Sequence, residues 1–298
     1  MQGVDNPRME FNFPAFHGGR AELGAGRDAG QPRAAVPDPG AMPELRHPYA
    51  PIRIAKKLEI DTEILLDAGA TKSLHFREIN EKEAFTLRDA EGVYFRASVL
   101  SLSPQRAKVV VYERMVDSPE SDARITLVCA VLARQRMLLV AQKATELGVV
   151  RIIPVFSAHS VGPSGLAHEK AHAWPGQTLR AARQCRRASV PEMRSAIPLE
   201  RAMEDPAWND AAIRYTLDDR ATNEREPWPV RDRGKPMDVA FAVGPEGGWS
   251  DAEREMLQGH GARPLRLGGR VLRAETAVLV GLTVLQYALG DLADGSSS

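Results

Sequence analysis

Residues 239–248 read Val-Ala-Phe-Ala-Val-Gly-Pro-Glu-Gly-Gly, and residues 265–276 read Leu-Arg-Leu-Gly-Gly-Arg-Val-Leu-Arg-Ala-Glu-Thr. Each is a short apolar run followed at once by a glycine-bearing turn, which predicts a buried strand that delivers a tight loop. Ser250 and Glu253 have the spacing of a capping box, so we expect a helix to begin just after the first loop. In open α/β sheets, loops at the carboxyl ends of the strands form the ligand crevice. The two stretches therefore predict one shared pocket lined by backbone groups.

The glycine loop at 244–248 is also compatible with an ordinary turn that leads into a helix. A phosphate site is a further possibility, because helix N-termini attract anions. No Walker lysine and no G-x-G-x-x-G pattern accompany the loop, however, and Glu246 would repel a phosphate group. The pattern favours a ligand such as S-adenosylmethionine, whose adenine and ribose can be held by backbone groups, over a nucleoside triphosphate.

After Asp117-Ser-Pro119, strands alternate with helices along the chain. The strands are expected at 125–132, 149–156, 239–243 and 264–267. The helices are expected at 137–147, where Gly148 would end the helix, and at 166–189, with a break at 174–176. Alternation at this spacing indicates βαβ units, and thus an α/β domain with a parallel sheet that is buried on both faces.

The preceding part of the chain has short strand-like runs separated by turn residues. These runs lie at 60–66, 84–87, 93–99 and 108–112. They predict a small β-barrel over 42–116. Residues 1–41 are rich in Gly and Pro and hold no Lys, so we expect a disordered extension there, and a second disordered tail at 294–298.

The composition excludes several classes of protein. Basic and acidic residues balance at 39 each, so any contact with nucleic acid must come from a local patch. Two cysteines cannot build a disulfide framework, which favours a reduced, cytoplasmic setting. The apolar run 277–289 is too short to span a membrane, so a buried helix is expected.

Three motifs in this order resemble the RsmE family of 16S ribosomal RNA (uracil-N3) methyltransferases, which belongs to the SPOUT class. They are 143–149 (Lys-Ala-Thr-Glu-Leu-Gly-Val), 244–248 and 267–277. The resemblance covers 120–293 well and 42–116 only faintly. It implies a trefoil-knotted methyltransferase domain at 120–293 and a PUA-like, RNA-binding β-barrel at 42–116. It also implies a homodimer, S-adenosylmethionine as methyl donor, and methylation of a uridine at N3 in the RNA of the small ribosomal subunit.

The resemblance also assigns site residues. The donor pocket falls on Gly244, Pro245, Glu246, Gly247, Gly248, Leu267, Gly268, Val271, Leu272, Arg273 and Thr276. Arg270, Arg273 and Glu275 are placed near the reacting centre. An arginine there would stabilise the uracil anion, with Arg273 the first choice and Arg270 the second, while Glu275 would orient an arginine or accept the proton. Alternatively, Glu275 pairs structurally with an arginine across the loop.

The strongest local positive patch lies at 180–194. Arg180, Arg183 and Arg187 share a helical face, and Arg186 adjoins them. We expect this patch to contact RNA phosphates, although a solvated helix face has the same pattern. In the barrel, His75 and Arg77 echo the basic strand that the family presents to RNA.

Departures from the family pattern keep other functions open. Gly269, Ala274 and Trp249 replace the family's Pro, Thr and Phe, and Arg183 and Arg186 replace Glu and Gly. The altered RNA-facing motifs leave a non-catalytic RNA-binding or ribosome-assembly factor as the alternative. A third hypothesis is a nucleotide-dependent enzyme that uses the glycine turns to bind phosphates. His159, His168 and His172 lack a further ligand, so no metal site is expected.

Overall fold

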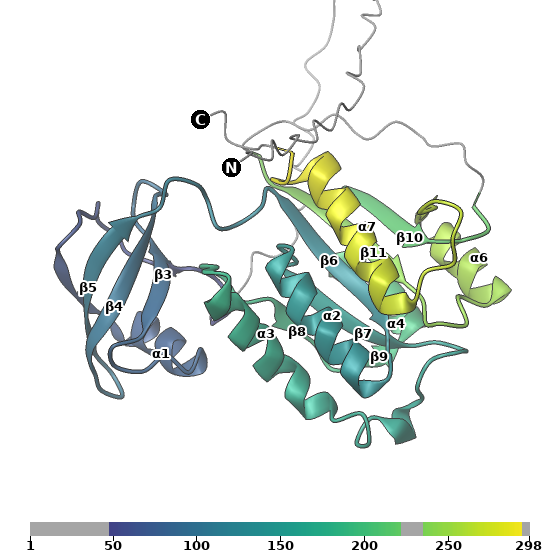
Figure 1. Ribbon diagram of the computed structural model, residues 1–298, viewed down its shortest axis with the longest axis horizontal. Coiled ribbons are helices and arrows are strands. Elements are labelled where there is room, and N and C mark those ends of the chain that lie inside the picture. Colours follow the sequence, from purple (N-terminus) through teal and green to yellow (C-terminus); the bar gives the residue numbers. More distant parts are fainter. Residues whose placement is uncertain (1–47, 222–234, 294–298) are drawn as a thin grey trace, which may run out of the picture. The chain divides into compact units, whose positions relative to one another are not determined.

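The computed structural model describes residues 48–221 and 235–293 (Figure 1). The disordered tails predicted at 1–41 and 294–298 lie outside the described residues. The described residues form two sheets that share no strand. The break between the sheets contains Asp117-Ser-Pro119, where the sequence changes texture. The domain boundaries at 42–116 and 120–293 remain a prediction.

The first sheet has five strands in the order β1-β3-β4-β5-β2. These are β1 (Ile52–Arg53), β2 (Glu63–Leu66), β3 (Ala84–Arg88), β4 (Tyr94–Leu102) and β5 (Ala107–Arg114). All neighbours are antiparallel except β1 and β3, which are parallel. Helix α1 (Ala68–Phe76), which the sequence analysis missed, contacts both edge strands and is capped by the Asp67 side chain. The prediction located β2 to β5 but not the helix.

The second sheet is parallel throughout, which confirms the α/β prediction. Its strands are β6 (Ala123–Ala130), β7 (Arg151–Phe156), β8 (Glu192–Met193), β9 (Ile197–Pro198), β10 (Ile213–Leu217), β11 (Met237–Val243) and β12 (Arg263–Leu265). The order is β12-β10-β11-β6-β7-β8, with β9 also paired to β7. Strand β10 was not predicted, and it lies between the two strands that deliver the glycine loops.

Helices cover both faces of this sheet. One apolar cluster joins the sheet to α2 (Arg134–Glu146), α3 (Trp174–Gln184) and α7 (Ala274–Leu289). A second cluster joins it to α4 (Leu199–Met203), α5 (Pro206–Asn209) and α6 (Asp251–Gly259). Parallel sheets are normally covered in this way, because their strands are apolar on both faces. Figure 1 shows α2, α3 and α7 lying across the same face.

Two helix boundaries test the local predictions. Gly148 has φ 80° just after the end of α2, so the predicted left-handed stop is confirmed. The predicted helix at 166–189 is wrong in its first part, where the chain forms only a short 3-10 turn at Ala171–Ala173. The regular helix begins only at Trp174, with Pro175 in its first turn, where proline needs no hydrogen-bond partner.

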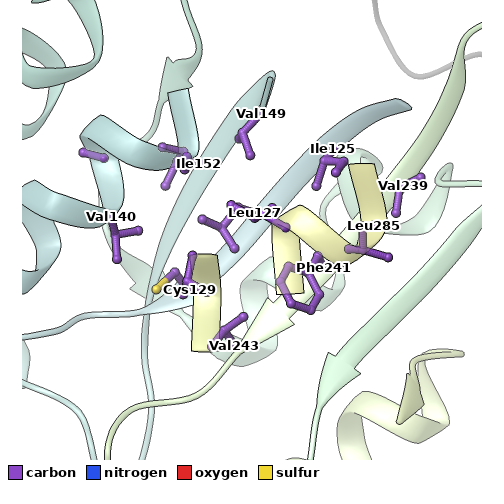
Figure 2. Packing of buried hydrophobic residues seen from close by; sticks show 14 of the residues in the cluster. Ile125, Leu127, Cys129, Val140, Val149, Ile152, Val239, Phe241, Val243 and Leu285 are labelled. Carbon is purple, nitrogen blue, oxygen red and sulfur yellow. The ribbon is translucent and has the colours of Figure 1, made fainter. Parts of the chain in front are cut away.

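Helix α7 packs closely on β11 at one glycine. Phe241 on β11 points toward α7 (Figure 2), and Gly281 is the residue of α7 that meets it. A Cβ atom on Gly281 would lie 2.3 Å from Cζ of Phe241, so the helix can approach the strand only without a side chain there. Among the described residues, no helix combines the length and apolar character that crossing a membrane requires.

Candidate active site

The two glycine loops line a single cavity of about 210 Å³ at the carboxyl edge of the parallel sheet. The loops follow β11 and β12, which are not neighbours, because β10 lies between them. The segment after β10, residues 217–220, therefore supplies a third wall of the cavity. The prediction that the loops share one pocket is thus matched by the geometry, with β10 as the element it lacked.

Most of the residues assigned to the donor pocket line this cavity. They are Gly244, Pro245, Glu246, Gly247, Gly248, Leu267, Gly268, Val271 and Leu272. Arg270 lines it too. Arg273 and Thr276 do not: both are exposed, whereas Ala274 and Ala277 of the same first turns of α7 line the cavity.

Backbone conformation explains why glycine stands at two of these positions. Gly248 has φ 69° and Gly268 has φ 68°, a left-handed conformation that other residues rarely adopt. Both allow sharp turns at the cavity wall. After the first turn, the Ser250 hydroxyl accepts from the Glu253 amide, and the Glu253 carboxylate accepts from the Ser250 amide, which confirms the predicted capping box.

The side chains of Trp249 and His159 pack against the first glycine loop. Trp249 is buried, and its Nε1 donates to Oγ1 of Thr216 on β10 at 3.1 Å. A Cβ atom on Gly244 would lie 3.2 Å from the Trp249 indole. A Cβ atom on Gly247 would lie 2.9 Å from Cβ of His159, whose Nδ1 is 3.0 Å from the Gly248 carbonyl oxygen. His159 therefore packs on the glycine loop.

The third wall carries acidic and basic groups side by side. Arg254 donates to Oδ1 of Asp218 at 3.4 Å and to Oδ1 of Asp251 at 3.2 Å, and Asp219 lies 4.0 Å away. Arg220 also pairs with Asp251. The cavity lining as a whole holds three carboxylates (Asp218, Asp219 and Glu246) and four arginines (Arg220, Arg254, Arg266 and Arg270), so it suits a ligand of mixed charge.

An arginine that the sequence analysis did not consider lies beside the cavity. Arg136, in the first turn of α2, forms an ion pair with Glu246, and its Nε lies 3.9 Å from Oε1 of Glu275. Glu275 thus lies beside an arginine of another helix, whereas the structural alternative for this residue was an arginine across the loop. No local motif marks Arg136, because its role depends on segments more than 100 residues away in sequence.

The predicted RNA contact is wrong for Arg187. Its side chain is 3% exposed and pairs with Glu120 at 2.7 Å. It also donates to the carbonyl oxygens of Thr145 and Val149. The helix α3 ends at Gln184, so the assumed shared face does not extend to Arg187. A guanidinium with this many internal partners is a structural group.

Arg77 is buried as well, so its prediction as an RNA contact is also wrong. It donates to the carbonyl oxygens of Ala188, Pro48 and Ala50, and burial lowers its pKa to about 10, against the opposing effect of Glu120. It therefore joins the segment after α1 to the segment after α3. No basic strand is presented to solvent at this position.

The remaining members of the predicted RNA surface are exposed to different degrees. Arg183 is half-buried, pairs with Glu83 at 2.5 Å and donates to the Glu78 carbonyl oxygen. Arg186 is exposed and lies 3.6 Å from Glu113. Arg180 and His75 are exposed. Carboxylates therefore neutralise much of the patch that looks basic in the sequence.

A larger cavity, of about 570 Å³, lies away from the glycine loops. Its lining comes from the first sheet, the segment 115–122 and the amino ends of β6 and β11. Opposite charges are already paired there, as in the 2.5 Å contact between Arg124 and Asp238. Among the described residues, no group of three or more His, Cys, Asp or Glu side chains could hold a metal ion.

A protein-family model matches more than half of the chain. The model of a family described as an RNA methyltransferase domain matches residues 119–286. Among curated relatives, the ribosomal RNA small subunit methyltransferase E of Mycobacterium bovis is 30% identical over 212 residues, covering 69% of this chain and 79% of that protein. The protein of the same name from Buchnera aphidicola subsp. Schizaphis graminum is 26% identical, covering 72% of this chain and 85% of that protein.

Solved structures agree with these matches. The ribosomal RNA small subunit methyltransferase E of Neisseria gonorrhoeae, bound to S-adenosyl methionine, is similar with a TM-score of 0.57 and 26% identity, covering 82% of this chain and 99% of that one. A protein from Legionella pneumophila, solved in complex with the cofactor SAM, has a TM-score of 0.53 and 30% identity, covering 81% of this chain and 98% of that one.

Proposed function

Because the chain belongs to the RNA methyltransferase family of ribosomal RNA small subunit methyltransferase E, we propose that it uses S-adenosylmethionine to methylate N3 of a uridine in small-subunit ribosomal RNA. The observation that carries this proposal is the cavity at 244–249 and 265–272, where two glycine loops meet at the carboxyl edge of the parallel sheet. The relatives named above support the class of reaction.

The cavity fits the donor in its chemistry. Apolar side chains at Leu217, Leu265, Leu267 and Leu272 line it together with glycine backbone, and both carboxylates and arginines contribute to the lining. Such a lining suits S-adenosylmethionine, which combines an adenosine with a sulfonium cation, an amino group and a carboxylate. The volume is below the roughly 300–1,000 Å³ of most small-molecule sites, so a donor would fill it and extend from its mouth.

When bound, S-adenosylmethionine supplies an electrophilic methyl group. The chain must then align uracil N3 with it and stabilise the uracil anion that loss of the N3 proton creates. Alignment of this kind lowers a barrier by roughly 7–11 kcal/mol at best. Arg270 lines the cavity and is exposed, so within one chain it is better placed than Arg273 to face the base. Glu275 remains the candidate for accepting or relaying the proton.

We further propose that the protein is a homodimer. Apolar side chains are exposed on α2 and α7, which contact each other, and they include Leu139, Val280 and Tyr287. Burial of these side chains against a second copy would remove them from water. Sedimentation equilibrium measures the mass directly, and a monomer at micromolar concentration would contradict the proposal.

We also propose that the second sheet belongs to a SPOUT-type knotted domain and the first sheet to a PUA-like barrel. Strand β12 lies at the edge of the sheet, yet α7 returns to pack on β11 and β6 in its centre. This path supports the threaded loop of a SPOUT-type trefoil knot at 266–273. The five-stranded sheet closed by α1 supports a PUA-like barrel. A cytoplasmic setting agrees with the two free cysteines, Cys129 and Cys185.

The test compares ribosomal RNA from cells with and without the protein. N3-methyluridine blocks base pairing and so stops reverse transcription one nucleotide before the modified base. We expect one stop in small-subunit RNA that disappears with the gene and returns with the wild-type protein. If no stop depends on the protein, while calorimetry shows no binding of S-adenosylmethionine, the alternative of a non-catalytic RNA-binding factor replaces the enzyme.

A further inference from the structure

Arg136 joins three elements that are distant in sequence. It lies in the first turn of α2, where the helix dipole disfavours a cation and where no acidic residue compensates locally. Its guanidinium pairs with Glu246 of the first glycine loop, and its Nε lies 3.9 Å from Oε1 of Glu275 in the first turn of α7. A locally unfavourable position is thus compensated only by partners that the tertiary fold supplies.

The two carboxylates differ in burial. The Glu246 side chain is 43% exposed, whereas the Glu275 side chain is 13% exposed. Oε2 of Glu275 is buried and makes no hydrogen bond within the part of the chain that the structure describes. Without Arg136, Glu275 would be a largely buried carboxylate with no cation beside it, and it would face Glu246 across the vacated space.

We propose that Arg136 is a positioning residue of the donor site, which holds the glycine loop through Glu246 and the start of α7 through Glu275. These two elements flank the threaded segment that carries Arg270, so the pairs fix the mouth of the cavity. The inference rests on the proposed function, since it takes this cavity to be the donor site.

The geometry separates this role from general support of the fold. The apolar contacts of α2 with the sheet come from other residues, among them Met137 and Val140, which are fully buried. Arg136 itself is 36% exposed and contacts the cavity wall through Glu246. Removing it should therefore disturb the loops more than the core. Arginine suits the position because its planar fork reaches two carboxylates at once, which the point charge of lysine does less well.

The experiment uses the full chain and four single variants: Arg136→Ala, Arg136→Lys, Glu246→Gln and Arg201→Ala. Arg201 is the control, because its only described ion pair is with Glu204 on the exposed face of α4. Calorimetry gives the Kd for S-adenosylmethionine, urea unfolding gives stability, and initial rates give kcat and the donor KM. We expect Arg136→Ala to raise Kd and KM by about tenfold or more, the cost of losing hydrogen bonds to charged groups, with a smaller change in kcat.

The other variants sharpen the test. Arg136→Lys should recover part of the affinity, and Arg201→Ala should equal the wild type. Glu246→Gln should raise the Kd for S-adenosylmethionine, as Arg136→Ala does. In the variant that combines the two changes, the loss of binding free energy should be smaller than the sum of the two single losses, because both changes break the same pair. Glu246 is on an exposed loop, so this variant carries the test alone if Arg136→Ala does not fold.

The experiment distinguishes a failure of the inference about Arg136 from a failure of the proposed function. Wild-type affinity and KM in Arg136→Ala or Glu246→Gln would overturn the inference and leave the proposed function standing. If the wild-type protein itself binds no S-adenosylmethionine, the proposed function falls and the inference with it.

Discussion

At the scale of single residues, burial decides what a charged side chain does. Arg187 and Arg186 are neighbours in sequence and look equivalent there. In the fold, Arg187 is enclosed by Glu120, Ser189 and two carbonyl oxygens, while Arg186 reaches into solvent. The first is part of the core of the molecule and the second part of its surface.

Substitution of the two arginines tests this distinction. Arg187→Ala should lower the free energy of unfolding by about 3–5 kcal/mol, because it leaves Glu120 buried without its cation. Arg186→Ala, the matched control, should change stability by less than about 1 kcal/mol, as exposed pairs do. Urea unfolding measures both. Equal, small effects would show that Arg187 is not the buried partner described above.

Gly268 and Gly269 form a second matched pair at this scale. Both have open space around the position of a Cβ atom, but only Gly268 has a left-handed φ. Gly268→Ala should cost about 1–2 kcal/mol of local strain and weaken donor binding by about tenfold, since the strained loop forms the cavity wall. Gly269→Ala should do neither. Calorimetry with S-adenosylmethionine checks this, and equal affinities would refute the role of the backbone conformation.

At the scale of elements, the packing of α7 on β11 sets how close helix and sheet can come. Replacement of glycine by alanine inside a helix normally stabilises by about 1 kcal/mol. At Gly281 the new methyl group would meet the buried ring of Phe241, and overpacking of a core costs about 1–3 kcal/mol or more. The clash outweighs the helix propensity because the ring has no room to move.

Gly281→Ala should therefore destabilise the protein by about 1–3 kcal/mol in thermal or urea unfolding. Gly259→Ala, at the end of α6 where nothing lies within 4 Å, should be neutral or slightly stabilising. Adding Phe241→Leu to Gly281→Ala should recover part of the loss, because it opens space for the methyl group. A stabilising Gly281→Ala would contradict the packing described here.

Some features of single elements can be predicted from a local sequence pattern. The capping box at Ser250 and the left-handed stop at Gly148 were predictable, because each depends on residues within one turn of a helix. Strand β10 was missed although Ile213, Tyr215 and Leu217 alternate with other residues. Its five residues are surrounded by short helices and turns, and its place between β11 and β12 depends on pairing that no local window contains.

At the scale of the whole molecule, Glu120 holds the segment between the two sheets against the segment that follows α3. It lies in the segment between β5 and β6, and it accepts from Arg187 and from the backbone and hydroxyl of Ser189. Burial alone would raise the pKa of its carboxyl group. The charge of Arg187 and these hydrogen bonds outweigh burial and hold the pKa below its ordinary value of 4.5.

This shift predicts a dependence of stability on pH. Because the pKa is lower in the folded state, the unfolded chain binds the proton first as the pH falls. The contribution of Glu120 is complete above about pH 4.5 and is lost as the pH falls toward the folded pKa. Unfolding free energies of the wild type should fall over this range, and Glu120→Gln should flatten the fall. Glu255→Gln, on the exposed face of α6, is the control, and an unchanged slope in Glu120→Gln would contradict the assignment.

The sequence by itself determined the parallel α/β class, both glycine loops and the family, because these depend on short runs of residues and on their order along the chain. Only the tertiary structure decided which cations are free and which groups meet at the donor cavity. It placed β10 between the loop-bearing strands, buried Arg187 and Arg77, and brought Arg136 to Glu246 and Glu275. The physical reason is that burial and charge pairing are properties of surroundings, and these surroundings come from segments that only folding brings together.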